Sequence, residues 1–365
     1  MAQPWQRARG AAQRHRQSVH SGPPGQRPQT WQRLGHRAVH WRQGECIGPI
    51  YWAALLLRPP GISVSSSPAA PSTVPGLDPV ASARWASAIR LSSPWLHEEV
   101  GARMLDRLQW FREMPKSWLD WEPIDGGLAA HRQLRERLPD AECLVQARHL
   151  PQALAATREA PRLGWNPLQW RRASAPRELS SDSKVQMVWA NMALHREPSP
   201  EGLMRQWHRL VDTGGFLMFS CFGPDTLREL RAVYAAQGWP APSHDFVDMH
   251  DLGDMLVHAG FAEPVMDMER IVLTYSGAEP LLAELRGLGR NLNAARWPNC
   301  RGRAWRRQLV RALEEGLPRD DQGRLSLTFE VVYGHAFKAA PKLAVAPNAT
   351  VGVDDFRAML KGSRR

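Results

Sequence analysis

The residues best placed to bind a ligand follow two apolar segments of the chain. The first segment, W-L-D-W-E-P-I-D-G-G over residues 118–127, supplies Asp120, Gly126 and Gly127, and the second, V-W-A-N, ends at Asn191. Glycine lets a backbone turn tightly and approach a bound molecule, and carboxylate and amide groups can hydrogen-bond to it. Ligands of parallel sheets lie beyond the carboxyl ends of the strands. The ends of these two segments are therefore candidate ligand-binding positions.

Other reactive side chains in the sequence indicate no second type of chemistry. The four cysteines lie far apart without a C-x-x-C pair, which argues against a zinc ribbon, a thioredoxin-type site and a disulfide scaffold, and favours a reducing cytoplasm. Asp248, His250 and Asp251 stand together at the start of a predicted helix, where capping is more typical than metal binding. Ser220 lies in an apolar segment without a G-x-S-x-G elbow, so nucleophilic catalysis is not expected. No metal is predicted, and no catalytic side chain is identified.

The positive charge of the chain is concentrated in its first part. The net charge is +11, but residues 1–77 hold nine arginines and one acid, which leaves only +3 for the other 288 residues. A nearly balanced body does not favour a nucleic-acid partner. The apolar run at 46–57 is too short to cross a bilayer and contains Pro49, so no membrane association is predicted.

Composition divides the chain into three parts. Residues 1–77 are rich in Arg, Gln, Ser and Pro and form either a flexible tail, a transit peptide or a stretch preceding the true start codon. Residues 78–340 are predicted to form the folded domain, and residues 341–365 a C-terminal tail.

The domain alternates between apolar strands and amphipathic helices. This alternation predicts a mostly parallel sheet with helices on both faces, closed by an antiparallel pair formed by the last two strands. No third strand can be assigned within 161–184, and residues 212–215 are predicted to form a turn. The predicted strands are 117–121, 142–146, 185–190, 216–222, 263–275 and 325–337, and the predicted helices are 94–114, 126–138, 151–160, 199–211, 223–238, 250–261, 279–290 and 301–316.

Four longer segments carry a family resemblance. They read VQMVWANMALH, DTGGFLMFSCFGPDTLREL, FVDMHDLGDMLVHAGFAEPVMDMERIVLTY and LTFEVVYGHAFK. From about Pro94 to Lys338 the sequence resembles the malonyl-[acyl-carrier protein] O-methyltransferases of biotin synthesis, within the class I S-adenosylmethionine-dependent methyltransferases. The resemblance implies a Rossmann-like α/β fold with seven strands, S-adenosyl-L-methionine as methyl donor, and an acceptor carboxyl on an acyl-carrier protein.

The sequence departs from this family at the donor loop. The family pattern V-L-D-x-G-x-G-x-G places glycines where this chain has Glu122 and Ile124, and only Gly126 matches the third glycine. We expect Ile124 to be strained by a positive φ, and the Glu122 carboxylate to point toward the methionine part of the donor and repel its carboxylate. The family's ribose-binding acid at the end of the second strand is also missing, because that place holds Gln146, Ala147 or Arg148.

Two functions remain open from the sequence. The first is a methyltransferase whose donor contacts Asp120, Gly126, Gly127 and Asn191, and the second is an inactive paralogue that acts as a binding or assembly factor. His195 is interpreted as a surface or hydrogen-bonded residue rather than a catalyst. The basic row on one predicted helix is either a solvated face or a dock for the acidic carrier protein; it comprises Arg301, Arg303, Arg306, Arg307 and Arg311.

Overall fold

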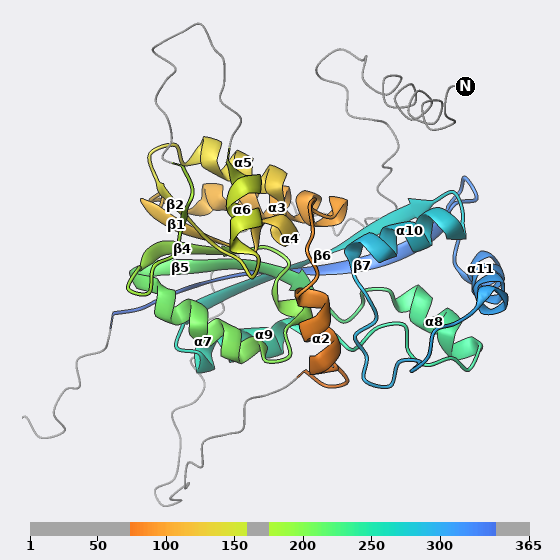
Figure 1. The fold of residues 1–365 in the computed structure, drawn as a ribbon. Coiled ribbons are helices and arrows are strands. Elements are labelled where there is room, and N and C mark those ends of the chain that lie inside the picture. Colours follow the sequence, from red (N-terminus) through yellow and green to blue (C-terminus); the bar gives the residue numbers. More distant parts are fainter. Residues whose placement is uncertain (1–73, 159–174, 341–365) are drawn as a thin grey trace, which may run out of the picture.

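A seven-stranded sheet forms the centre of the molecule (Figure 1). The computed structural model describes residues 74–158 and 175–340, so the predictions for 1–73 and 341–365 lie outside it. The strand order is β3-β2-β1-β4-β5-β7-β6, in which β1 to β5 pair in parallel and β7 is antiparallel to both β5 and β6. The strands are β1 (Ser117–Trp121), β2 (Glu142–Gln146), β3 (Arg177–Glu178), β4 (Val185–Ala190), β5 (Val211–Phe222), β6 (Ala262–Tyr275) and β7 (Leu325–Phe337).

Helices cover both faces of this sheet (Figure 1). Helices α3 to α6 lie on one face, α7 and α9 lie on the other, and α8, α10 and α11 gather where β6 and β7 extend beyond the shorter strands. The helices are α2 (Pro79–Ala86), α3 (Trp95–Arg107), α4 (Pro123–Gly126), α5 (Leu128–Arg137), α6 (Leu150–Thr157), α7 (Pro200–Leu210), α8 (Arg228–Ala236), α9 (Met249–His258), α10 (Ala278–Leu288) and α11 (Arg303–Gly316), with short 3₁₀ turns at Leu108–Trp110 and Leu194–Arg196.

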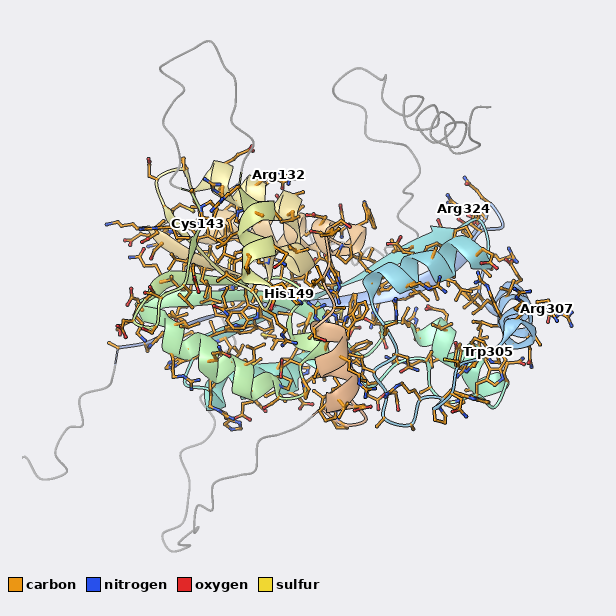
Figure 2. The ribbon with its side chains drawn as sticks, in the orientation of Figure 1. Arg132, Cys143, His149, Trp305, Arg307 and Arg324 are labelled. Carbon is orange, nitrogen blue, oxygen red and sulfur yellow. The ribbon has the colours of Figure 1, made fainter. Side chains whose placement is uncertain are left out.

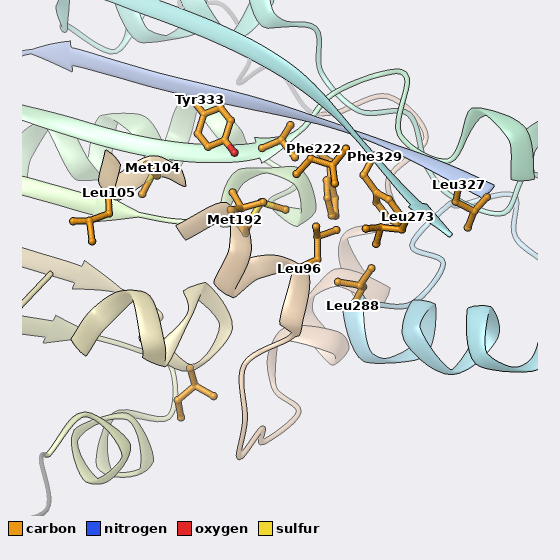
Figure 3. Close-up of a cluster of buried hydrophobic side chains, with 14 of the residues drawn as sticks. Leu96, Met104, Leu105, Met192, Phe222, Leu273, Leu288, Leu327, Phe329 and Tyr333 are labelled. Carbon is orange, nitrogen blue, oxygen red and sulfur yellow. The ribbon is translucent and has the colours of Figure 1, made fainter. Parts of the chain in front are cut away.

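The two faces of the sheet carry separate hydrophobic clusters. Side chains alternate along a strand, so Trp118 of β1 enters the cluster under α3 and α5, whereas its neighbour Leu119 enters the cluster under α7 and α9. Both side chains are fully buried. Figure 3 shows the first cluster continuing from α3 through Phe222 to Phe329 on β7. Burial on both faces explains why these strands read as continuous apolar runs.

The predicted fold class, the six predicted strands and the closing antiparallel pair are confirmed. The predicted turn at 212–215 is wrong, because the structure continues β5 from Val211 through Phe222. Gly214 donates its N–H to the Lys338 carbonyl at 2.8 Å, and Lys338 returns an N–H to Gly215 at 2.9 Å. The pair still makes the strand irregular: Gly214 has φ +82°, and the pairing of β5 with β4 shifts register here, so these residues form a bulge within β5 rather than a turn that ends it.

The described fold begins a few residues before position 78. Val74 and Leu77 are buried against Leu292, and the Asp78 side chain caps the start of α2. Within residues 74–158 and 175–340, no helix combines the length and the apolar character needed to cross a membrane.

Candidate active site

The loop that follows β1 takes an unusual backbone path at its first residue. Glu122 has φ +56° and ψ +58°, a left-handed conformation that glycine adopts far more easily. Its N–H donates to the carbonyl of Gln146, the last residue of β2, at 2.8 Å. Ile124 does not have the positive φ expected from the sequence, because it lies inside the short helix α4. The strained position is therefore the first glycine position of the pattern and not the second.

The Glu122 carboxylate is held at the end of β2. Its Oε1 accepts the backbone N–H of Arg148 at 2.8 Å. Burial raises the pKa of Glu122, and the Arg148 N–H together with the cations of Arg196 and Arg148 acts in the opposite direction. The sequence predicts that this carboxylate points toward the methionine part of the donor. In the structure it is held instead beside the end of β2, a strand that ends without an acid of its own. Its Oε2 makes no hydrogen bond to any residue of the described ranges.

Asp120 lies beneath the loop rather than on it. Its carboxylate is 3% exposed and lies 2.6 Å from Nδ1 of His131, a fully buried residue of α5. Burial raises the pKa of Asp120, while the contact with His131 lowers it. The pair fixes the start of α5 against the end of β1, so Asp120 shapes the loop from below.

Asn191 joins three segments of the site from a buried position. Its Nδ2 donates to the carbonyl of His97 at 2.8 Å and also to the carbonyl of Gly126. Its Oδ1 accepts the hydroxyl of Ser220 at 2.6 Å, and the same hydroxyl accepts the N–H of Met192 at 3.0 Å. The amide therefore ties α3 and the β1 loop to the ends of β4 and β5.

The two glycines of the loop are required by close packing. A Cβ on Gly126 would lie 3.2 Å from the Asn191 carbonyl. Gly127 has φ +126°, and a Cβ there would lie 2.8 Å from Oε2 of Glu98. That carboxylate accepts the N–H groups of Ala129 and Ala130 at the start of α5, at 2.9 and 3.1 Å. The structure thus brings the four sequence-predicted residues together around one loop.

An ion-pair cluster at the same edge was not foreseen from the sequence. Asp125 is paired with Arg90, and Nη2 of Arg196 lies 2.7 Å from its Oδ2. The side chains of Arg90 and Arg196 are only 14% and 12% exposed. Burial alone would raise the pKa of Asp125, but the two arginines and His97 hold it below its usual range. No sequence motif marks Arg90, which precedes α3 by several residues.

Three histidines, His97, His195 and His244, lie next to the Asp125 ion-pair cluster at this edge of the sheet. Nδ1 of His97 lies 2.6 Å from the Asp125 carbonyl, so this nitrogen carries the proton. Burial, with the nearby Arg196 cation, lowers the pKa of His97 to about 4. Burial also lowers the pKa of His195 and of His244, whose Nε2 donates to the His195 carbonyl at 2.7 Å. All three rings are therefore neutral at pH 7.

A cavity of about 250 Å³ opens beside this cluster, beyond the end of β5. Arg196 and His195 form the side nearest the β1 loop, and Phe222 and Phe329 form an apolar wall. Arg286 and Arg290 also line the cavity and are exposed. The remaining lining residues are Trp85, Thr226, Leu227, Leu230, Pro242, Ser243, His244, Phe246, Leu285, Leu288, Gly289, Asn291 and Leu292.

The polar atoms of the loop region fit the charged donor that the resemblance implies. Nη2 of Arg90 and Nη1 of Arg196 are buried and find no hydrogen-bond acceptor in the described part of the chain. An unpaired buried N–H is costly, and an anionic acceptor such as the carboxylate of the donor's methionine part is the kind of group that would satisfy it. The Glu122 Oε2 adds an acceptor on the opposite side, toward β2. Among residues 74–158 and 175–340, no group of three His, Cys, Asp or Glu side chains is arranged for a metal.

Three curated relatives share about a third of their residues with this chain over most of its described length. The malonyl-[acyl-carrier protein] O-methyltransferase of Laribacter hongkongensis is 38% identical over 257 residues, which cover 68% of this chain and 84% of the relative. The same-named proteins of Gallionella capsiferriformans and Nitrosospira multiformis are 38% and 36% identical, covering 69% and 68% of this chain and 87% and 85% of their own. No protein-family model matches the chain.

Proposed function

The chain belongs to the malonyl-[acyl-carrier protein] O-methyltransferase family, and on this premise we propose that it methylates the free carboxyl of a malonyl group carried by an acyl-carrier protein. The observation that carries the proposal is the composition of the cavity beyond β5. Three arginines and no carboxylate line it, between walls that are otherwise mostly apolar. A short acyl chain ending in a carboxylate matches this combination of charge and apolar surface.

The size and electrostatics of the cavity suit a small acyl group. A volume of about 250 Å³ lies below the usual range for drug-sized ligands and is adequate for a three-carbon unit with part of its thioester arm. Arg196 is the innermost cation, and it orients the carboxylate. The neutral His195 and His244 add no charge of their own. A carboxylate is already ionised at neutral pH, so the reaction needs positioning and exclusion of water rather than a general base.

The donor of this proposed reaction is S-adenosyl-L-methionine, which when bound supplies the methyl group. Asp120, Gly126, Gly127 and Asn191 support the loop that would hold it, chiefly by fixing the backbone. Arg90 and Arg196 would hold its amino-acid carboxylate through their unpaired N–H groups. Because Arg196 also lines the cavity, donor and acceptor would meet on either side of this one side chain.

The carrier protein would dock on the basic face of α11. Arg303, Arg307 and Arg311 are exposed there and make no ion pair within the described ranges, whereas Arg306 pairs with Glu279. Figure 2 shows Arg307 on α11 at the end of the molecule remote from Cys143 of β2. Arg301 lies over the Trp305 ring at 3.9 Å, which stiffens the start of this surface. Docking through such a surface would weaken as salt is raised.

The test is a methylation assay with three acceptors. The purified chain is incubated with S-adenosylmethionine and malonyl-carrier protein, acetyl-carrier protein or free malonate, and the products are read by mass spectrometry. We expect one added methyl on malonyl-carrier protein, none on acetyl-carrier protein, and little on malonate. The Laribacter hongkongensis relative serves as positive control. Absence of methyl ester while that relative forms it would refute the proposal.

A second candidate function is a binding protein that retains the fold without catalysis. It is favoured by the replacement of two loop glycines by Glu122 and Ile124 and by the ion pairs that tie Asp125 inside the loop. This candidate predicts that malonyl-carrier protein binds in calorimetry without any methyl transfer. Binding with transfer supports the first candidate.

A further inference from the structure

The end of β2 has no acidic side chain of its own, yet the structure places a carboxylate there. In dinucleotide-binding α/β folds, an acid near the end of the second strand accepts hydrogen bonds from ribose hydroxyls. Here β2 ends at Gln146 and is followed by Ala147 and Arg148. The Glu122 carboxylate, which comes from the loop after β1, instead sits against the Arg148 N–H at 2.8 Å.

The backbone of Glu122 directs its side chain to this place. With φ +56°, the residue takes the conformation that a glycine would have, and its N–H is bonded to the Gln146 carbonyl at 2.8 Å. The main chain of Glu122 is therefore hydrogen-bonded to the last residue of β2, and its side chain is hydrogen-bonded to Arg148 just after that strand. This conformation is strained for a residue other than glycine, and it is the strained backbone that places the carboxylate at β2.

One oxygen of this carboxylate remains available. Oε1 is occupied by Arg148, whereas Oε2 has no hydrogen-bond partner in the described residues and is not fully buried. Arg90 and Arg196 lie on the Asp125 side of the same loop with their own unpaired N–H atoms. The loop thus offers an anionic hydrogen-bond acceptor on one side, which suits a ribose diol, and cationic hydrogen-bond donors on the other, which suit an amino-acid carboxylate.

We propose that Glu122 is the ribose-binding acid of this chain, accepting hydrogen bonds from the donor's hydroxyl groups in place of the acid that β2 lacks. This inference rests on the proposed function, because it requires a nucleoside donor. It reverses the expectation that Glu122 obstructs the site, since the carboxylate lies at β2 and not over the loop.

The experiment measures binding of S-adenosylhomocysteine and of its 2′-deoxy and 3′-deoxy analogues by calorimetry. The unaltered chain should bind the parent compound more tightly than at least one deoxy analogue, on the order of tenfold, as a hydrogen bond to a charged group implies. Glu122→Gln should lose a similar factor on the parent and should no longer distinguish the analogues. Glu122→Gly should behave like Glu122→Gln and should fold readily, because glycine suits the observed φ.

Glu197→Gln is the matched control. Glu197 is also partly buried near Arg148 and Arg196, but its Oε1 accepts the N–H of Ser199, two residues further on. The change removes the same charge from the same edge of the sheet and should leave the discrimination between parent and analogues intact.

The outcomes separate the inference from the function on which it rests. If both Glu122 variants bind S-adenosylhomocysteine and still prefer it to the deoxy analogues as the unaltered chain does, Glu122 does not bind the ribose, and the methyltransferase proposal is unaffected. Failure of the unaltered chain to bind any of the three compounds would overturn both. Equal loss of discrimination in Glu197→Gln would show a general charge effect and would also overturn the specific role.

Discussion

Replacing Asn191 by alanine should destabilise the fold strongly, because one amide joins three segments. The substitution removes donors to the carbonyls of His97 and Gly126 and an acceptor for the Ser220 hydroxyl, all in the protein interior. At about 1 kcal/mol for each net hydrogen bond, the expected loss is about 3 kcal/mol. For a domain of this size, that corresponds to a fall in Tm of roughly 6–12 °C.

The pair Asn191 and Ser220 allows a sharper test. Ser220→Ala removes the hydroxyl that donates to Asn191 Oδ1 and accepts the Met192 N–H, so about 2 kcal/mol should be lost. The double variant should lose about 1 kcal/mol less than the sum of the single losses, because the shared hydrogen bond is counted in both.

Urea unfolding followed by circular dichroism gives these free energies of unfolding. Asn291→Ala is the control, because its side chain donates to the Ala241 carbonyl and accepts the Asn293 N–H outside the fully buried interior, and it should cost about 1 kcal/mol or less. If Asn191→Ala proved as mild as Asn291→Ala, or if the two site substitutions were strictly additive, the buried network would not stabilise the fold as reasoned.

The remaining predictions concern pH, backbone and charge. The pKa of His97 is lowered from 6.5 to about 4, so between these pH values the unfolded chain binds more protons than the folded one, and the free energy of unfolding should fall by up to about 3 kcal/mol as the pH drops through that range. Urea midpoints measured at several pH values check this. A His97→Asn variant whose stability fell equally steeply with pH would contradict it. Gly127→Ala should lower the free energy of unfolding by at least about 2 kcal/mol, because Gly127 has φ +126° and a Cβ there would meet the Glu98 carboxylate. In the control Gly287→Ala, the new Cβ would meet no atom within 4 Å and would lie inside helix α10, so this variant should be slightly more stable. Thermal unfolding of both variants checks this. Arg196→Gln should raise KM for malonyl-carrier protein on the order of tenfold, while Arg132→Gln on the exposed side of α5 (Figure 2) should not; equal KM values in steady-state assays would remove Arg196 from acceptor binding.

The central strands could be predicted because each contains a short apolar run bounded by polar residues. β1, β2 and β4 have the predicted bounds, since burial on both faces leaves little ambiguity in such runs. The turn at 212–215 could not be judged locally, because the pairing of Gly214 and Gly215 with Lys338 spans more than a hundred residues. The two-residue strand β3 carries no periodic pattern, and only its pairing with β2 defines it.

The site was predicted only where a motif marked it. Asp120, Gly126, Gly127 and Asn191 follow strand ends and were found on that basis, and whether they contact a donor stays a prediction. Arg90 and Arg196 carry no such signal, because their meeting at Asp125 depends on how α3 crosses the β1 loop. The direction of Glu122 was missed for a similar reason, since a side chain at a positive φ leaves the backbone on the opposite side from an ordinary residue.

Arg196 belongs to two binding regions at once, and this has a thermodynamic consequence. Its guanidinium is bonded to Asp125 in the β1 loop, and its side chain also lines the cavity beyond β5. An anion in the cavity that attracts Arg196 must weaken its hold on Asp125, and a ligand at the loop that competes for Arg196 must change the charge presented to the cavity. The affinities at the two places are therefore linked, and the linkage has the same magnitude in both directions. Binding of a ligand at one place would therefore be measurable as a change in affinity at the other.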